Sequence, residues 1–353
     1  MYQEAKAEEA TEVDEVLDEV RDEISADDDD LREARERRKC VLEAAASFDG
    51  FLRKFNSGSV AHGTVNNLVD DADGGVVLNR QVYPDLGPDS DDEGGPAEIV
   101  AAVRDHIMPI VRETYPDAEG RLTKRAILIR FKEPNDDDVD PSVDLIVGLT
   151  RKDADGIWIP NLDRDRWDPS DPEEHTRLLT AKPKDLRVHR ARIIRLAKAA
   201  VKHDSSPVLI SFNIEALALE QIEEVDGLTE SLRSFFDEAA SSISESLTED
   251  PAEVSGAIKL PEGMTRTRAA KRLQYFADKV QEAVDADDRA GIEAALAELY
   301  PDQFPDAEKS EKKSLAEALR SGDEGHIRKS FAAGPAAALK PKARSHGNDA
   351  HAA

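Results

Sequence analysis

The chain has 353 residues, with 47 Lys or Arg against 75 Asp or Glu, so its formal charge is −28. This length allows one large domain or two ordinary ones with a sizeable core. The single cysteine, Cys40, excludes an internal disulfide and a zinc site built from cysteines. No stretch approaches the roughly 18 consecutive apolar residues of a membrane helix, and the first residues lack a secretory apolar core, so we expect a cytoplasmic protein without a membrane partner. The acidic charge also disfavours binding to extended nucleic acid, because neutralising phosphates needs a basic surface.

Residues 1–30 are predicted to form an acidic arm, because they hold 14 acids against Lys6 and Arg21. Such a run of like charges favours an extended, solvated segment. A helix is the alternative, since apolar residues recur there at helical spacing: Val13, Val16, Leu17, Val20 and Ile24.

A mixed α+β region is predicted over residues 31–165. It opens with a helix over 31–55, and a second helix is expected over 96–115. Four short apolar runs bounded by Gly, Pro, Asn or Asp are typical of strands: 75–80, 125–131, 142–149 and 156–161. The expected fold is α+β, with a small mixed sheet.

Helical patterns replace strands in the second half, which we assign to a helical C-terminal lobe over residues 166–333. The last segment, residues 334–353, is short and alanine-rich, and we expect it to be disordered. The helices are predicted at about 171–180, 184–203, 208–223, 227–247, 265–285 and 288–299.

Three aspartates near apolar strands are the candidate catalytic and metal-binding residues. Asp71 and Asp73 are two residues apart, so on a strand they point the same way. Asp144 lies inside the apolar run SVDLIVGL, where a carboxylate is costly unless it is paired or binds a metal ion. A D-x-D spacing also arises by chance in so acidic a chain, so Asp144 carries more weight than the pair.

A glycine-containing turn precedes these aspartates. In Gly58-Ser59-Val60-Ala61-His62-Gly63-Thr64, glycines let the backbone approach a ligand, and the N–H groups and hydroxyls can meet phosphate oxygens. A plain turn between two elements is the alternative for Gly58 and Ser59. His62 and Thr64 are weaker candidates, and His62 would either touch phosphate or cap the turn.

The order of these features resembles the DNA polymerase β nucleotidyltransferase superfamily. In that pattern GS follows a helix, D-x-D follows about a dozen residues later, and a third carboxylate lies on a later strand; here Asp71 follows Ser59 by 12 residues. The resemblance implies that the three aspartates hold two Mg²⁺ ions (or Mn²⁺) and that Gly58 and Ser59 hold the phosphates. Gly74-Gly75 departs from the family, which shows an apolar residue there, and we expect a bulge at this point.

The helical half carries a second resemblance. Residues 186–217 look like the spine of oligoadenylate synthases, cyclic GMP-AMP synthase and bacterial CD-NTases. The matching residues are Arg195, Leu196, Lys198, Ser211, Phe212, Ile214 and Glu215. The resemblance implies that Lys198 and Ser211 contact the triphosphate tail of a donor nucleotide.

The composition of this segment also favours an anion site. Residues 182–202 hold eight bases and one acid in a strongly acidic chain. On a helix, five of the bases fall within a sector of roughly 80°. These are Lys184, Arg187, Arg195, Lys198 and Lys202, so Arg195 and Lys202 join the weaker nucleotide-binding candidates. A solvated basic face is the alternative.

These features predict a two-lobed, Mg²⁺-dependent nucleotidyltransferase that uses NTP substrates and releases pyrophosphate. Asp71 and Asp73 would bind both metals, and Asp144 would bind the catalytic metal and orient or deprotonate the acceptor hydroxyl. The CD-NTase resemblance implies a linear or cyclic oligonucleotide second messenger, an antiphage role and room for a regulatory protein partner. The alternatives are a toxin-like enzyme that modifies a tRNA end or a protein, and a nucleotide-binding regulatory protein without activity.

Overall fold

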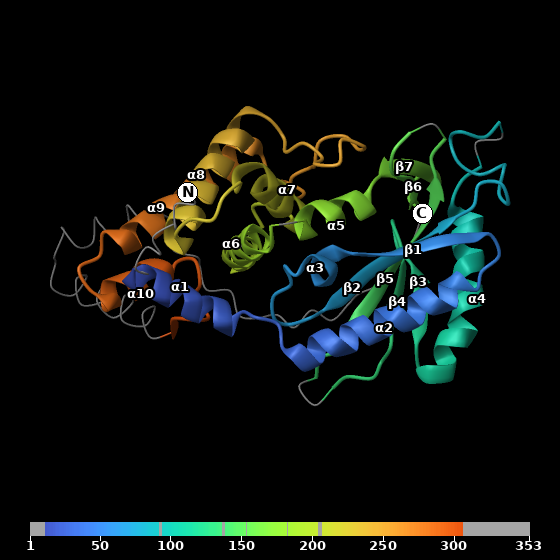
Figure 1. Cartoon of the computed structure of the whole chain (residues 1–353), viewed down its shortest axis with the longest axis horizontal. Helices are drawn as coiled ribbons and strands as arrows, with labels where there is room; N and C mark the ends of the chain where they lie inside the picture. The colour runs from blue at the N-terminus through green and yellow to red at the C-terminus, as the bar shows by residue number, and fades with distance from the viewer. Residues whose placement is uncertain are drawn as a thin grey trace, which may run out of the picture.

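A seven-stranded mixed sheet forms one part of the molecule (Figure 1). This computed structural model describes residues 11–305 except 92–93, 136–137, 153, 182 and 204–206. Its strands run in the order β1-β2-β5-β4-β3, and β6 pairs with β5 and β7. β2 and β5 are parallel, and the other pairs are antiparallel. The strands are β1 (Phe51–Ser57), β2 (Asp71–Leu78), β3 (Glu119–Leu122), β4 (Ile127–Arg130), β5 (Ser142–Thr150), β6 (Ile157–Asn161) and β7 (Arg166–Ser170).

Two helices, α2 (Asp28–Ala46) and α4 (Ala97–Thr114), cover one face of the sheet (Figure 1). Apolar residues of both helices and of β2, β4 and β5 share one buried cluster. Burial of this apolar surface is the main force that holds these layers together. The short helix α3 (Gly58–His62) follows β1 directly and packs against β2.

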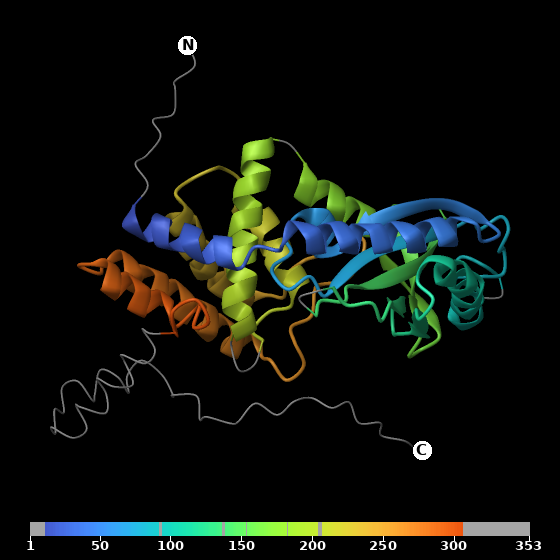
Figure 2. The same cartoon turned by 90° about the horizontal axis from the view of Figure 1, so that it is seen from below.

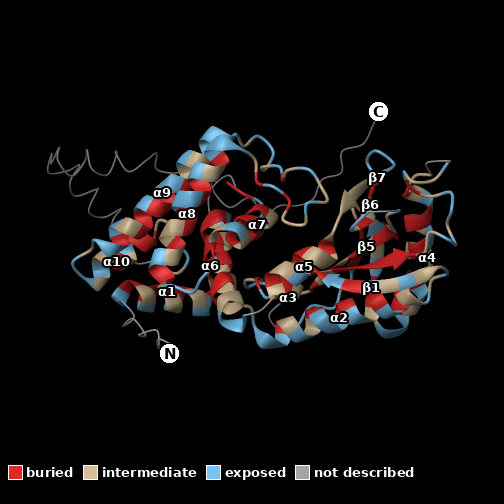
Figure 3. Cartoon of the chain, turned by 45° about the horizontal axis from the view of Figure 1, so that its top comes forward, coloured by how far each residue is buried: buried red, intermediate tan, exposed pale blue. Residues whose placement is uncertain are grey.

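The remaining helices form a second lobe with its own buried cluster. Figure 2 shows α6 standing across the direction of α1, and Figure 3 shows buried residues inside both lobes. α6 is buried on much of its surface, so it is a core helix of this lobe and not a surface helix with one apolar stripe. The helices are α1 (Glu12–Glu23), α5 (Pro172–Thr180), α6 (Lys184–His203), α7 (Ser211–Gln221), α8 (Leu228–Glu245), α9 (Arg266–Val284) and α10 (Arg289–Leu296).

A buried arginine of α2 fixes the chain just before β5. Arg37 is 2% exposed and lies over the ring of Phe131 at 4.8 Å from its centroid. It donates to the carbonyl oxygens of Glu133 at 2.6 Å and Pro141 at 3.0 Å, and it pairs with Asp140. Because β5 begins directly after Pro141, this guanidinium helps to set the position of the strand that carries Asp144.

The α+β class and the mixed sheet are confirmed, and the helices predicted from residue 96 onward lie where they were expected to within a few residues. The helix predicted over residues 31–55 is wrong in its last part. α2 ends at Ala46, Gly50 adopts φ +74°, and β1 begins at Phe51. β1 pairs with β2, which satisfies its backbone groups, so tertiary pairing overrides the local helical pattern. As a result the Gly58-Ser59 turn follows a strand, where the superfamily pattern led us to expect a helix.

The prediction of an extended acidic arm is wrong for residues 12–23, which form α1. Val13, Val16, Leu17 and Val20 are buried in the core of the helical lobe. Thr11 and Asp14 form a capping box, and Asp14 also accepts hydrogen bonds from the backbone and hydroxyl of Thr229 at 2.8 and 2.5 Å. Burying an apolar stripe therefore outweighs the repulsion between the acids on the outer face.

The expected bulge at Gly74-Gly75 is absent. β2 keeps a continuous register with β5 through both glycines, and the irregularity lies at the far end, between Phe51 and Arg53 of β1. A Cβ on Gly75 would lie 2.3 Å from the ring of Phe55, so the glycine makes room for an aromatic side chain.

Residues 166–170, which we had placed in the helical lobe, form β7 of the sheet. The division of the chain at residues 165 and 166 otherwise stays a prediction. The expected disorder of 334–353 concerns residues outside those that the structure describes. Among the described helices, none is both long and apolar enough to cross a membrane.

The packing of α1 gives a direct test. Leu17→Ala should lower the free energy of unfolding by about 2–5 kcal/mol, because it removes a fully buried side chain. Glu15→Ala, on the exposed face of the same helix, should change it by no more than about 0.5 kcal/mol. Urea unfolding followed by circular dichroism measures both. Equal, small effects of the two variants would contradict the packing of α1.

Candidate active site

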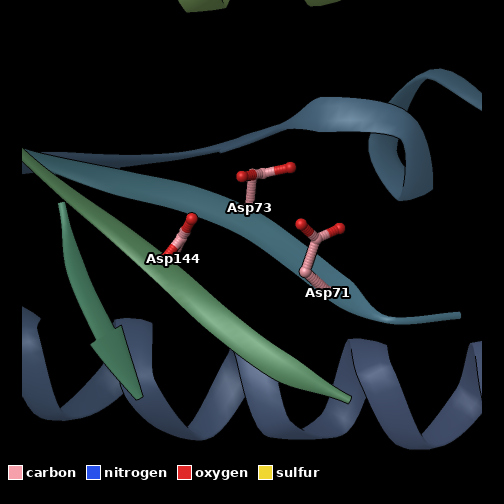
Figure 4. Close-up of side chains that lie close together, drawn as sticks. All are labelled: Asp71, Asp73 and Asp144. Atoms are coloured by element: carbon pink, nitrogen blue, oxygen red, sulfur yellow. The ribbon is translucent and has the colours of Figure 1, made fainter. Parts of the chain in front are cut away.

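The structure brings together the three aspartates that the sequence singled out. Asp73 of β2 lies directly opposite Asp144 of β5 in the parallel register, and Asp71 is two residues earlier on the same face. Each contributes a carboxylate oxygen, and these oxygens lie within 4.8 Å of one another. Figure 4 shows the three side chains on one side of the two strands, with a helix running past the other side.

Burial, followed by the charge of a nearby aspartate, raises the pKa of all three carboxyl groups. Burial, followed by the charges of Asp71 and Asp144, raises the pKa of Asp73 to about 7. Burial and Asp70 raise the pKa of Asp71, and Lys198 acts in the opposite direction. Burial and Asp71 raise the pKa of Asp144. Three negative charges at this distance therefore need a positive partner.

The Gly58-Ser59 turn lies against this cluster. Gly58 has φ +72°, which a glycine adopts easily, and a Cβ on it would lie 1.7 Å from Oδ2 of Asp73. The residue must therefore be glycine for the backbone to pass so close to the carboxylate. Ser59 follows as the second residue of α3, and its carbonyl oxygen accepts from the N–H of Thr64 at 3.0 Å.

Lys198 of α6 contacts the residue Thr64, which follows α3. Its Nζ donates to Oε1 of Glu215 at 2.7 Å and lies 3.1 Å from Oγ1 of Thr64. The Thr64 hydroxyl donates to the same Glu215 oxygen at 2.5 Å. Nδ1 of His62 lies 3.1 Å from Oε2 of Glu215, and its Nε2 lies 3.1 Å from Oγ1 of Thr176. His62, Thr64 and Lys198 thus meet at one buried carboxylate.

Glu215 is the site residue to which the sequence analysis gave no role. It is 5% exposed. Burial alone would raise its pKa, but the charge of Lys198 and the contact with His62 outweigh this and lower the pKa to about 2. The available signal was an acid inside the apolar run Ile214–Ala218, the same signal that marked Asp144.

The other predicted nucleotide-binding residues are less closely grouped. Ser211 is exposed at the first position of α7, one turn before Glu215 and so on the same side of the helix. Lys202 is exposed in the last turn of α6. Arg195 lies in a different environment. Burial and the charges of Arg21 and Arg192 lower its pKa, and Asp22 acts in the opposite direction. Its guanidinium is thus directed toward α1.

The donor set of the aspartate cluster fits a hard divalent cation. Mg²⁺ and Mn²⁺ prefer oxygen ligands, and here one face of the sheet presents carboxylate oxygens from three residues. Oδ1 of Asp144 is buried without a hydrogen-bond partner, although buried polar atoms almost always have one. The raised pKa values point the same way, because a bound cation would favour the ionised form that burial and nearby negative charges disfavour.

The fold of the chain is that of solved CD-NTases. CdnC of E. coli MS115-1, solved in a complex with HORMA-deltaN, matches with a TM-score of 0.59 and 16% identity, over 85% of this chain and 99% of that one. CdnG of Bradyrhizobium diazoefficiens, in complex with GTP, matches with a TM-score of 0.62 and 15% identity, over 85% and 99%. The cyclic AMP-GMP synthase DncV of Vibrio cholerae, in complex with a linear intermediate, matches with a TM-score of 0.54 and 13% identity, over 84% and 89%.

No protein-family model matches the sequence, and neither does any curated protein. The structural likeness at these identities establishes the fold alone, which is the α+β class that the sequence predicted. The roles of individual residues rest on the geometry described above.

The raised pKa of Asp73 predicts a pH-dependent stability without metal. The carboxyl group of Asp73 binds its proton more tightly in the folded state, with a pKa of about 7, than in the unfolded chain, where the ordinary value is 3.8. The fold should therefore lose stability as the pH rises from about 4 to 7 and then level off. Asp73→Asn should raise Tm by several degrees at pH 8, and this gain should shrink toward pH 4.

Thermal unfolding in a chelator, followed by addition of Mg²⁺, measures this effect. Mg²⁺ should stabilise the unsubstituted protein at pH 8 far more than the Asp73→Asn variant. Asp117→Asn, at an exposed site, is the control and should show no pH-dependent gain. A lower Tm of Asp73→Asn at pH 8 would mean that Asp73 supports the fold.

Proposed function

We propose that the chain is a nucleotidyltransferase of the CD-NTase kind, which joins NTPs into a linear or cyclic oligonucleotide and releases pyrophosphate. The observation that carries this proposal is the arrangement of three aspartates against the Gly58-Ser59 turn, with Lys198 bound to Thr64 just after α3. Lys198 is close enough for its charge to act on Asp71. A triphosphate bound between the lobes would thus meet cations from both directions.

In this proposal Asp71, Asp73 and Asp144 hold two divalent cations, Mg²⁺ or Mn²⁺. When bound, these ions neutralise charge on the triphosphate and lower the pKa of the acceptor hydroxyl. Net charge does not oppose this role, because the local charge of the site depends on its own ions and on Lys198.

The protein's own groups bind and orient the two substrates. The backbone at Gly58 and Ser59 holds phosphate oxygens of the donor NTP, while Lys198 and Ser211 hold its γ end. Asp144 orients the acceptor hydroxyl and takes its proton. The hydroxyl oxygen then forms a bond to the α-phosphorus, the bond from that phosphorus to the bridging oxygen breaks, and pyrophosphate leaves with the electron pair.

Small nucleotides suit this chain better than tRNA as acceptors. A tRNA would need a wide basic surface, whereas the chain has a net charge of −28. NTPs and Mg²⁺ are supplied in the cytoplasm, so we place the reaction there. Antiphage signalling is part of the proposal, and a regulatory protein is a candidate partner, as CdnC of E. coli was solved with HORMA-deltaN.

Purified protein incubated with Mg²⁺ and four labelled NTPs tests the proposal. The expected result is an oligonucleotide product, identified by chromatography and mass spectrometry, together with one pyrophosphate for each bond formed. Label transfer to added tRNA or protein without such a product would favour the toxin-like alternative. ATP binding without turnover would favour a regulatory protein.

Substitution of the aspartates should separate chemistry from folding. Asp144→Asn and Asp71→Asn should each lower the rate of product formation by about 100-fold or more, because each removes a ligand charge and, for Asp144, the proton acceptor. Tm should stay unchanged or rise, because clustered negative charge is relieved. Asp163→Asn, an exposed aspartate, should keep full activity. If Tm falls strongly together with the activity, the aspartates are needed for folding.

A further inference from the structure

The ammonium group of Lys198 is held on three sides by the protein. An ammonium has three N–H donors. Three acceptors surround this one: Oε1 of Glu215 at 2.7 Å, Oγ1 of Thr64 at 3.1 Å and the carbonyl oxygen of Thr64 at 3.4 Å. Its side chain is 11% exposed, so solvent does little to define its position. Glu215 and Thr64 therefore determine where the charge of Lys198 lies.

The same carboxylate also contacts the helix that carries the Gly58-Ser59 turn. Oε2 of Glu215 lies 3.1 Å from Nδ1 of His62, the last residue of α3. Nε2 of His62 continues to Oγ1 of Thr176 in α5 at 3.1 Å. One oxygen of Glu215 thus faces Lys198 and Thr64, and the other faces α3 itself.

An ionised carboxylate is costly at a place that is 5% exposed, unless it is paired and hydrogen-bonded. Here both oxygens are used, by groups from α3, from the segment that follows it and from α6. A glutamine of the same shape would offer one acceptor oxygen and one N–H₂ donor, and it would carry no negative charge to pair with Lys198. The arrangement therefore depends on a carboxylate.

We propose that Glu215 is a positioning residue, which fixes the Lys198 ammonium at a set distance from the Gly58-Ser59 turn so that both can hold one donor triphosphate. This inference rests on the proposed function. It adds a residue that does not touch the nucleotide and acts through Lys198. Because the two phosphate-binding groups come from different lobes, a single buried carboxylate between them sets their separation.

The test measures nucleotide affinity in a double-mutant cycle. Calorimetry with Mg²⁺ and α,β-methylene-ATP or its GTP counterpart gives Kd without turnover. Glu215→Gln should raise Kd about tenfold, and so should Lys198→Met, which removes the ammonium but keeps the stem. In the Lys198→Met background, Glu215→Gln should change Kd by less than about twofold, because no ammonium is left to position.

Two results would overturn the inference. Tighter binding by Glu215→Gln would show that Glu215 competes with phosphate for Lys198. An equal rise in Kd with and without Lys198 would show that Glu215 only supports the fold. Glu215→Asp, which keeps the charge on a shorter side chain, should fall between the original protein and Glu215→Gln.

Asp250 provides a matched control. Its carboxylate is also buried and pairs with a histidine, His175 of α5, at 2.6 Å. Its other hydrogen bonds come from backbone N–H groups of residues 252–255. Asp250→Asn should lower Tm and leave Kd within about twofold. A rise in Kd as large as that of Glu215→Gln would mean that any buried pair between these elements has the same effect.

If Glu215→Gln does not fold, substitutions of Thr64 test the inference instead. Thr64→Val keeps the shape but removes the hydroxyl that lies between Glu215 and Lys198, and it should raise Kd about threefold, while Thr64→Ser should restore affinity. An unchanged Kd in Thr64→Val would overturn the inference. Failure of the unsubstituted protein to bind either analogue would instead overturn the proposed function, so the two failures are distinguishable.

Discussion

The parallel pairing of β2 with β5 is the constraint on which the site depends. It places Asp73 directly beside Asp144, with Asp71 on the same face, and so gathers three carboxylates that repel one another. Burial and nearby negative charges raise the pKa of all three, and Oδ1 of Asp144 is left without a partner. The three carboxylates could hold a cation, and contacts around the strands keep them in register. Arg37 serves that end where the chain enters β5.

A second buried carboxylate nearby has the opposite electrostatic character. Glu215 has its pKa lowered to about 2 although it is more buried than the aspartates, because Lys198 and His62 lie against it. The contrast shows how one acidic chain places a carboxylate cluster and a paired lysine close to each other, as the proposed function requires. Carboxylates without partners attract metal ions, while a carboxylate with partners holds a lysine in place. The net charge of −28 decides neither of these local charges.

The sequence predicts those features that depend on residues close together in the chain, and it fails where the partners are distant. Periodicity located the helices after residue 96 and most strands, because each buries its own apolar face. The same reasoning failed at β1, whose stability comes from pairing with β2, and at α1, whose apolar stripe needed a partner lobe that local sequence does not reveal. Asp71, Asp73 and Asp144 could be selected as a group from motif order. The role of Glu215 could not, because its partners His62 and Lys198 are distant in the chain.

The N-terminal helices complete the link between the two halves of the site. α1 packs within the helical lobe and α2 on the sheet, so the short segment between them must cross from one lobe to the other. There Ser25 bridges to Asn66, the N–H of Asn67 donates to the carbonyl oxygen of Ile24 at 2.8 Å, and Asn66 donates to the carbonyl oxygen of Arg195 at 2.9 Å. The chain just after Thr64 is therefore tied to α6 on one side and to the α1–α2 junction on the other. Because Thr64 also contacts Lys198 and Glu215, the segment after α3 is held to α6 at two neighbouring points, Thr64 and Asn66. Two contacts restrict its position more than a single one would.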